Sequence, residues 1–299
     1  MLIRDNYTLK KQGLSTQNEP SNDLILYGNV RQYPDMYYAY KKFGSYFGLD
    51  TDRFFLANGC ENAIKNVFLA LKPTTLCWGI PTWRMLEVYC EALNMKPIMK
   101  NFSYDGYKFK EPDIYTQKCD VLYTNCGITT CFKYDFDSNK LYESKSKYNI
   151  CDITYQNIEE MKKSIEILSK NDKNIIVGSF DKLIGGGLRL GFAIYPKELH
   201  HKMSLQREQY VNMLAYNWLI NTDFTVDENI YVKELKTYSN IEYLTDNFFT
   251  IKGEVVTNIP HHEFDVDGYK FTRFGIPNSI TEFNSIHVLL KDLNNEYNR

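Results

Sequence analysis

The stretch NIIVGSFDKLIGGGLRLGFAIY (residues 174–195) consists of two apolar runs joined by a loop with one lysine and three glycines. The runs at 174–180 and 188–195 have the length and apolar content of buried strands. In the loop, Lys182 offers a nucleophilic amine and Arg189 a cation that suits a phosphate. These residues alone leave two interpretations open: a site built around Lys182, or a glycine hairpin with two exposed bases. A nicotinamide-binding GxGxxG motif is disfavoured, because it opens a helix and GGGLRLG leads into a strand.

Strands and helices alternate along the chain before and around this stretch. Further strand-like apolar runs lie at 52–59, 74–81, 119–125 and 148–155, and helical spacing of apolar residues occurs at 33–49, 60–72, 82–94 and 158–171. Alternation of this kind indicates an α/β fold with a mainly parallel central sheet and helices on both of its faces.

The character of the sequence changes at about residue 210. A helical region rich in tyrosine and asparagine is followed by strand-like runs at 247–253, 254–259 and 269–276 and by a closing helix at 279–293. We therefore predict three parts: an N-terminal arm (1–30), a large ligand-binding domain (31–209) and a small, abbreviated α+β C-terminal domain (210–299).

Composition excludes several classes of function. The 299 residues carry a formal net charge of −2, which gives no electrostatic reason to expect nucleic acid. Neither a membrane-spanning run of about 20 apolar residues nor the apolar core of a signal peptide is present. The seven cysteines are irregularly spaced and the histidines lack metal-ligand spacing. We expect a cytoplasmic protein without a metal site and without nucleic-acid or membrane partners.

Polar residues follow several of the predicted strands. In open parallel sheets ligands bind beyond the carboxyl ends of the strands. There, NGCEN (58–62) turns from a strand into a helix, and the free backbone N–H groups at a helix N-terminus suit a phosphate. CDITY (151–155) places Asp152 at a strand end with Tyr155 just beyond. By itself Asp152 could equally cap the following helix.

Taken in order, these motifs resemble those of the fold-type I enzymes that use pyridoxal 5′-phosphate (PLP), in the class I/II aminotransferase superfamily and nearest its histidinol-phosphate aminotransferase branch. The resemblance covers about 33–192 and returns at 269–283. SFDKLIGGGLRLGFAI resembles the family's lysine loop. It implies that Lys182 forms a Schiff base with PLP and moves the substrate's α-proton, while Arg189 and Ser179 bind the cofactor phosphate. It also implies the family's seven-stranded type of sheet.

The resemblance gives roles to the residues that would surround the cofactor ring. Asp152 of CDITY would pair with the pyridinium nitrogen, and an ionised carboxylate there keeps the ring able to accept electrons. Tyr155 would hydrogen-bond the 3′-oxygen together with Asn125 of YTNCGITTC (123–131). Trp83 of PTW would stack on the ring.

Other positions would bind the phosphate and the substrate. Gly59, Cys60 and Glu61 of NGCEN match the family's phosphate turn. Arg273 of FTRFGIPNSITEF would bind the substrate's α-carboxylate through two hydrogen bonds. Tyr33 of YPD matches a tyrosine that reaches the partner subunit's phosphate, which implies a homodimer.

Four departures from the family pattern bear on activity. Asp181 stands where a serine usually precedes the lysine, and the asparagine-proline motif is reduced to YTNCGITTC. The gap from Lys182 to Arg189 is one residue shorter than usual, and the small domain is short. The leading hypothesis is an aminotransferase acting on an amino donor and a keto acceptor. A decarboxylase of the phosphoserine or phosphothreonine type is the alternative within PLP enzymes, and a degenerate, non-catalytic PLP-fold protein is the alternative outside them.

Overall fold

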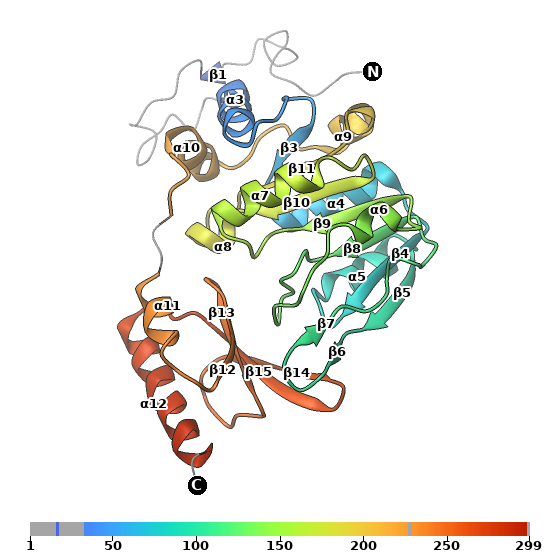
Figure 1. Cartoon of the computed structure of the whole chain (residues 1–299). Coiled ribbons are helices and arrows are strands. Elements are labelled where there is room, and N and C mark those ends of the chain that lie inside the picture. Colours follow the sequence, from blue (N-terminus) through green and yellow to red (C-terminus); the bar gives the residue numbers. More distant parts are fainter. Residues whose placement is uncertain (1–15, 18–32, 227–228, 298–299) are drawn as a thin grey trace.

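A seven-stranded sheet forms the centre of the larger part of the chain (Figure 1). The computed structural model describes residues 16–17, 33–226 and 229–297, so the predicted arm at 1–30 lies outside the described residues apart from Thr16 and Gln17. In spatial order the strands are β3 (Phe54–Ala57), β11 (Gly191–Ile194), β10 (Asn174–Ser179), β9 (Tyr148–Asp152), β8 (Val121–Thr124), β4 (Thr75–Ile80) and β5 (Lys96–Asn101).

Only β11 runs against its neighbours in this sheet. It pairs antiparallel with both β10 and β3, whereas the pairs from β10 across to β5 are all parallel. The predicted mainly parallel, seven-stranded α/β fold is therefore confirmed.

Helices cover both faces of the sheet. They are α3 (Met36–Phe47), α4 (Cys60–Leu71), α5 (Met85–Ala92), α6 (Lys140–Glu143), α7 (Ile158–Leu168), α8 (Asp181–Ile184), α9 (His200–Gln206) and α10 (Met213–Asn221), with a 3₁₀ turn at Lys197–Leu199. Successive strand residues pack into different cores, because side chains alternate across a strand. On β10, Ile176 joins the core that holds Ile165 of α7, and Val177 joins the core that holds Val67 of α4.

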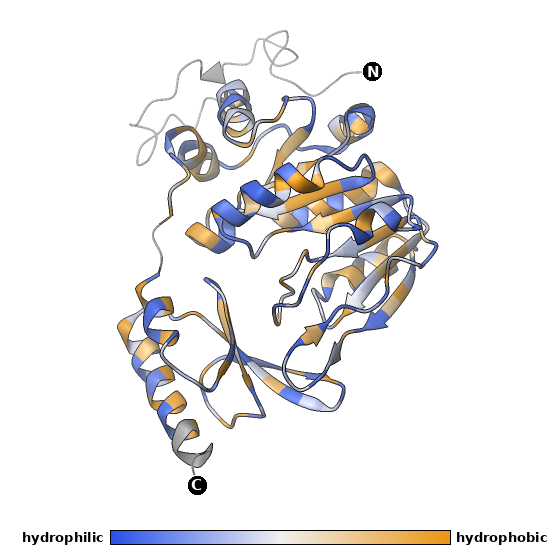
Figure 2. Cartoon of the chain, in the orientation of Figure 1, coloured by the Kyte–Doolittle hydropathy of each residue, from blue (hydrophilic) through white to orange (hydrophobic). Residues whose placement is uncertain are grey.

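The helix boundaries follow from local chemistry. Helix α7 begins with a capping box, in which Asn157 accepts a hydrogen bond from the Glu160 N–H and Glu160 accepts one from the Asn157 N–H. In Figure 2 the inner strands of the sheet are coloured mostly as hydrophobic residues, whereas hydrophilic residues are frequent along helices such as α7. This distribution is what a sheet buried on both faces requires.

A second, antiparallel sheet of four strands follows along the chain. Its order is β12 (Ile241–Leu244), β13 (Phe248–Lys252), β15 (Tyr269–Gly275) and β14 (His261–Val266), and α11 (Ile230–Leu235) and α12 (Ile280–Tyr297) accompany it. Buried residues of these helices and strands form a core of their own. Two-residue strands also pair, β1 (Thr16–Gln17) with β2 (Tyr33–Pro34) and β6 (Ser103–Tyr104) with β7 (Phe109–Lys110).

Three strands differ from the sequence-based expectation. Strand β12 (Ile241–Leu244) lies in the region before 247 that was expected to be helical. The run at 254–259 is a loop, and the strand instead spans His261–Val266. Edge strand β5 was not anticipated, because the side chains of KPIMKN are mostly exposed and give no apolar signal. None of the helices in the described ranges is long and apolar enough to cross a membrane.

Candidate active site

The candidate site lies at the carboxyl ends of β9 and β10, next to the first turn of α4. A cavity of about 180 Å³ opens there. It is lined by Cys60, Glu61, Ile64, Trp83, Thr130, Asp152, Thr154, Tyr155, Ser179, Asp181, Lys182, Gly186 and Arg189. Eight residues that the sequence singled out thus meet around one space, which is the edge where ligands bind in open α/β sheets.

Lys182 is the nucleophilic group of this cavity. It lies on α8, a single helical turn directly after β10, and its Nζ is 5.5 Å from the centre of the Tyr155 ring. Burial lowers the pKa of the Lys182 amine from its ordinary value of 10.5, and the positive charges of Arg273 and Arg189 lower it further, against an opposing effect of Asp181. A lowered pKa leaves more of the amine neutral and therefore nucleophilic.

Asp152 is a buried carboxylate at the end of β9, with only 7% of its surface exposed. The Tyr123 hydroxyl donates to its Oδ2 at 2.5 Å, and the Thr154 N–H donates to its Oδ1 at 2.9 Å. Burial raises the pKa of Asp152, although these hydrogen bonds act against the rise. Within the described ranges Asp152 forms no ion pair, and burying an ionised carboxylate without a countercharge is costly. The position therefore suits a cationic group of a ligand.

Asn125 is linked to Asp152 through the Tyr123 hydroxyl. Its side-chain amide donates to the Tyr123 hydroxyl at 3.2 Å, and its carbonyl oxygen accepts from the Thr82 hydroxyl at 2.6 Å. Asn125 is buried and does not line the cavity, so in this structure it supports the Tyr123–Asp152 hydrogen bond.

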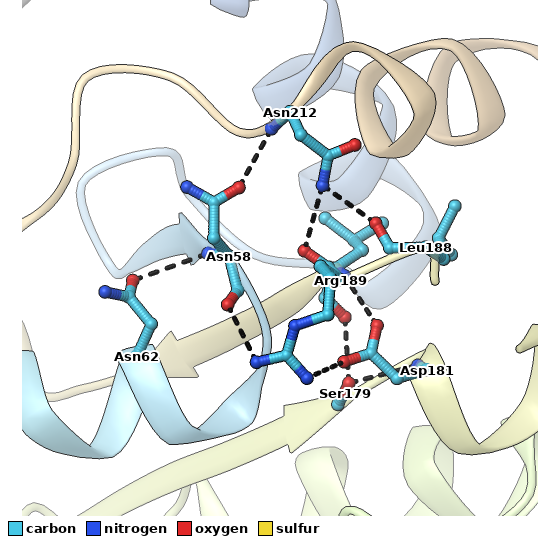
Figure 3. A network of polar contacts seen from close by, with 8 residues as sticks. Asn58, Asn62, Ser179, Asp181, Leu188, Arg189 and Asn212 are labelled. Carbon is cyan, nitrogen blue, oxygen red and sulfur yellow. Dashed lines mark hydrogen bonds and ion pairs between the residues drawn. The ribbon is translucent and has the colours of Figure 1, made fainter. Parts of the chain in front are cut away.

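A candidate anion-binding corner lies where the α4 turn meets Arg189. Gly59, which precedes α4, has φ +89°, and the Arg189 Nη2 donates to the Asn58 carbonyl at 3.4 Å (Figure 3). A Cβ atom at Gly59 would lie 2.7 Å from that guanidinium nitrogen, so a larger residue would displace the Arg189 side chain in addition to straining the backbone at this positive φ. The guanidinium and the free N–H groups of the helix start therefore place positive charge at one corner of the cavity.

Ser179 and Asp181 close the glycine loop on itself. The Ser179 hydroxyl donates to the Leu190 carbonyl at 3.1 Å and accepts from the Asp181 N–H at 3.0 Å. The Asp181 carboxylate accepts from the Leu190 N–H at 2.7 Å and lies 3.4 Å from the Arg189 Nη1 (Figure 3). The unexpected acid thus has a defined place: it fixes the backbone after Arg189 and partly neutralises the guanidinium. The two hydrogen bonds of the Ser179 hydroxyl, the predicted phosphate ligand, are thus made to the glycine loop itself.

Arg273 brings a positive charge to the site from the second sheet. It lies on β15, and its guanidinium carbon is 4.6 Å from the centre of the Phe248 ring. Phe248 in turn packs edge-on against Tyr155, with ring centres 5.6 Å apart. Burial raises the pKa of the Tyr155 hydroxyl to about 12, and the charge of Arg273 opposes this rise. The Arg273 Nε is buried, with no hydrogen-bond partner in the described part of the chain.

Some residues of the site have no distinguishing sequence signal, and one predicted residue is described only in its backbone. Thr130 and Thr154 line the cavity, but short polar residues in loops give no distinguishing sequence signal. Tyr33 contributes its backbone to β2, whereas its side chain lies outside the described part of the structure.

Gly191 is the residue at which β11 touches the α4 turn, and this contact predicts a large stability effect. A Cβ atom there would lie 2.5 Å from the Gly59 carbonyl oxygen and 2.6 Å from the Cys60 nitrogen. Because backbone has to move, we expect Gly191→Ala to lower the free energy of unfolding by about 3 kcal/mol. Urea denaturation measures this, with Gly187→Ala as the control because open space surrounds Gly187. Equal loss in both variants would contradict the prediction.

Known protein structures resemble this chain in fold. No protein-family model and no curated protein sequence matches the chain. Solved structures do match, at low sequence identity. The histidinol-phosphate aminotransferase from Clostridium acetobutylicum is 16% identical with a TM-score of 0.69, and the match covers 90% of this chain and 92% of that one.

Two further structures show the range of activities found with this fold. The aspartate aminotransferase from Thermotoga maritima is 16% identical, with a TM-score of 0.64 and coverage of 98% of this chain and 95% of that one. The L-threonine-O-3-phosphate decarboxylase from Porphyromonas gingivalis is 12% identical, with a TM-score of 0.61 and coverage of 87% and 88%. The chain therefore has the fold of these enzymes, as the resemblance predicted.

Proposed function

We propose that the chain is a PLP-dependent aminotransferase that moves an amino group between an amino acid, or a phosphorylated amine, and a keto acid. The observation that carries the proposal is the composition of one cavity. It combines the Lys182 amine with its lowered pKa, the buried Asp152 carboxylate without an ion pair, and the cationic corner at Arg189. The shared fold supports the same reaction class.

The residues of the cavity fit PLP group by group. Asp152 suits a protonated ring nitrogen, because a ligand cation would compensate its buried charge. The α4 turn and Arg189 suit the phosphate. Trp83 and Tyr155 provide aromatic surface beside Lys182, which is the amine that would react with the aldehyde. When bound, PLP supplies an electrophilic aldehyde and a ring that accepts electrons from a bond broken at the substrate's α-carbon.

The chain's own groups supply positioning and proton transfer. Lys182 Nζ, whose pKa is lowered, is the group that would take a proton and return it. Asp152 keeps a negative charge at the far end of the site and is held in orientation by Tyr123 and the Thr154 N–H. Arg273 offers a planar guanidinium and a buried Nε without a hydrogen-bond partner among the described residues, which suit a substrate carboxylate.

A decarboxylase is the second candidate, because the L-threonine-O-3-phosphate decarboxylase has this fold as well. Both activities use the same cofactor groups and differ in the bond at the α-carbon that is broken. Transamination needs the C–H bond broken, with a base in reach, and Lys182 is that base in our proposal.

A panel of amino donors tests the proposal. The protein loaded with PLP is incubated with single amino acids and phosphorylated amines, and cofactor and gas products are measured. We expect one class of donor to convert the cofactor to pyridoxamine 5′-phosphate with release of the matching keto acid. Release of carbon dioxide with PLP unchanged would replace the proposal by the decarboxylase. Failure to bind PLP at all would favour a non-catalytic protein.

The homodimer that the resemblance implies for Tyr33 also stays a proposal. Light scattering of the purified protein at several concentrations measures the mass, and a monomer throughout would contradict it.

A further inference from the structure

Asn212 connects three segments that meet at the anion-binding corner. It is the N-cap residue of α10, and its backbone N–H donates to the Asn58 Oδ1 at 2.9 Å. Its side-chain Nδ2 donates to the Leu188 carbonyl at 2.9 Å and to the Arg189 carbonyl at 3.4 Å (Figure 3). One residue thus binds the turn before α4 and the backbone on both sides of Arg189.

These contacts hold Arg189 in an unfavourable backbone conformation. Its φ is +50°, in the left-handed region that a residue with a Cβ atom rarely adopts. The Leu188 carbonyl belongs to the peptide group before Arg189, and the Arg189 carbonyl belongs to the peptide group after it. A donor that binds both carbonyls fixes both peptide planes, and these planes define the φ and ψ angles of Arg189. From the other side, Asp181 binds the N–H of the second plane, at Leu190.

The partner of Asn212 on the α4 turn is itself fixed. The Asn58 side chain donates to the Glu208 Oε2 and to the Tyr210 carbonyl at 3.3 Å. Asn62, one turn into α4, donates to the Glu208 Oε1 at 2.8 Å. The segment 207–212 is therefore attached to the start of α4 by contacts that do not involve Arg189. Asn212 thus holds the backbone of Arg189 in place relative to the turn before α4.

We infer that Asn212 is a positioning residue that sets Arg189 over the α4 turn for binding the phosphate of the cofactor, an inference that rests on the proposed function. Asn212 itself does not line the cavity, and it acts through the Arg189 backbone. Its effect is therefore confined to ligands that carry the phosphate.

The two halves of the Asn212 amide have separable roles. The Oδ1 accepts from the Ala215 N–H at 3.0 Å and caps α10, while the Nδ2 binds the Arg189 loop. Serine caps a helix about as well as asparagine but has no amide donor. Asn212→Ser thus keeps the cap and removes the two hydrogen bonds that position Arg189.

The test measures binding of PLP and of pyridoxal, which lacks the phosphate, to the cofactor-free protein by absorbance titration. We expect Asn212→Ser to weaken PLP binding roughly tenfold to a hundredfold, the range for residues that orient metal-binding side chains, and to leave pyridoxal binding unchanged. Asn221→Ser is the matched control. Asn221 ends the same helix, and its Nδ2 donates to the Asn217 carbonyl.

A double-mutant cycle with Arg189→Ala completes the test. If Asn212 acts through Arg189, Asn212→Ser has no further effect on PLP affinity once Arg189 is removed. Full additivity, or equal weakening of PLP and pyridoxal, would overturn the inference while leaving the cofactor assignment intact. Wild-type protein that binds no PLP would overturn the proposed function and this inference with it.

Discussion

Lys182→Ala is expected to lower the rate of amine transfer on the order of 10⁴-fold or more. General base catalysis alone contributes about 10²–10⁴-fold, and this substitution also removes the nucleophile. Among the described residues, Lys182 is the one lysine that lines the cavity. Steady-state rates with the best amino donor measure the loss, and borohydride reduction followed by peptide mass analysis should locate the cofactor adduct at Lys182.

Two further variants make this result specific. Lys182→Arg keeps a positive charge but not a titratable nucleophile, so it should be as inactive as Lys182→Ala. Lys170→Ala changes an exposed lysine near the start of β10, at the opposite end of the strand, and should keep full activity. An adduct on another lysine, or activity in Lys182→Arg, would refute the assigned role.

The lowered pKa of Lys182 also gives the direction of a pH effect. Reaction of PLP with the cofactor-free protein requires the neutral amine, so its rate should rise with pH and level off below the ordinary lysine value of 10.5. Arg273→Gln removes a nearby positive charge and should move this midpoint to higher pH.

Asp152→Asn is the second substitution with a large expected effect. It preserves the shape of the side chain and removes the buried negative charge that would face the cofactor's ring nitrogen. Loss of one preorganised electrostatic group of this kind costs on the order of 10²–10³-fold in turnover. Single-turnover formation of pyridoxamine 5′-phosphate measures the effect on the chemical step. Asp172→Asn, at an exposed aspartate beyond the far end of β10, serves as the control.

Stability without cofactor provides an independent check on Asp152. Its pKa is raised in the folded protein above the ordinary value of 3.8, so the folded state binds more protons than the unfolded state between these two values. The contribution of Asp152 to the free energy of unfolding therefore falls as pH rises through that window. Asp152→Asn should remove this contribution, so the difference in unfolding free energy between wild type and variant should change across the window. Urea denaturation at several pH values measures it. An unchanged pH dependence would contradict the burial of an unpaired carboxylate.

Much of the candidate site could be predicted from the sequence, because its residues lie at or just after the ends of strands. Asp152 and Ser179 end neighbouring parallel strands, Lys182 follows directly, and the glycine turn before α4 follows β3. A sheet of this kind brings such residues to one edge whatever its loops do. Their meeting around one cavity is therefore a property of the topology.

The remaining features depend on contacts that have no sequence signal. Asp181 was notable as an acid near a predicted phosphate site, but its bond to the Leu190 N–H depends on the path of the loop. Asn212 is one of many asparagines in a polar segment, and its function arises from its distance to Arg189 in space. Edge strand β5 and strand β14 lack a periodic apolar pattern because most of their side chains are exposed.

Strand β11 lies antiparallel between β3 and β10, and this placement determines the stage of folding at which the candidate site is completed. The anion-binding corner needs β3, near residue 57, beside β11, near residue 191, so it depends on contacts of long sequence separation. During synthesis, a growing chain cannot complete the candidate site until residues 191–194 have left the ribosome and paired with β3. On the proposed function, PLP would therefore bind only after this pairing, and it would then stabilise the finished sheet by mass action.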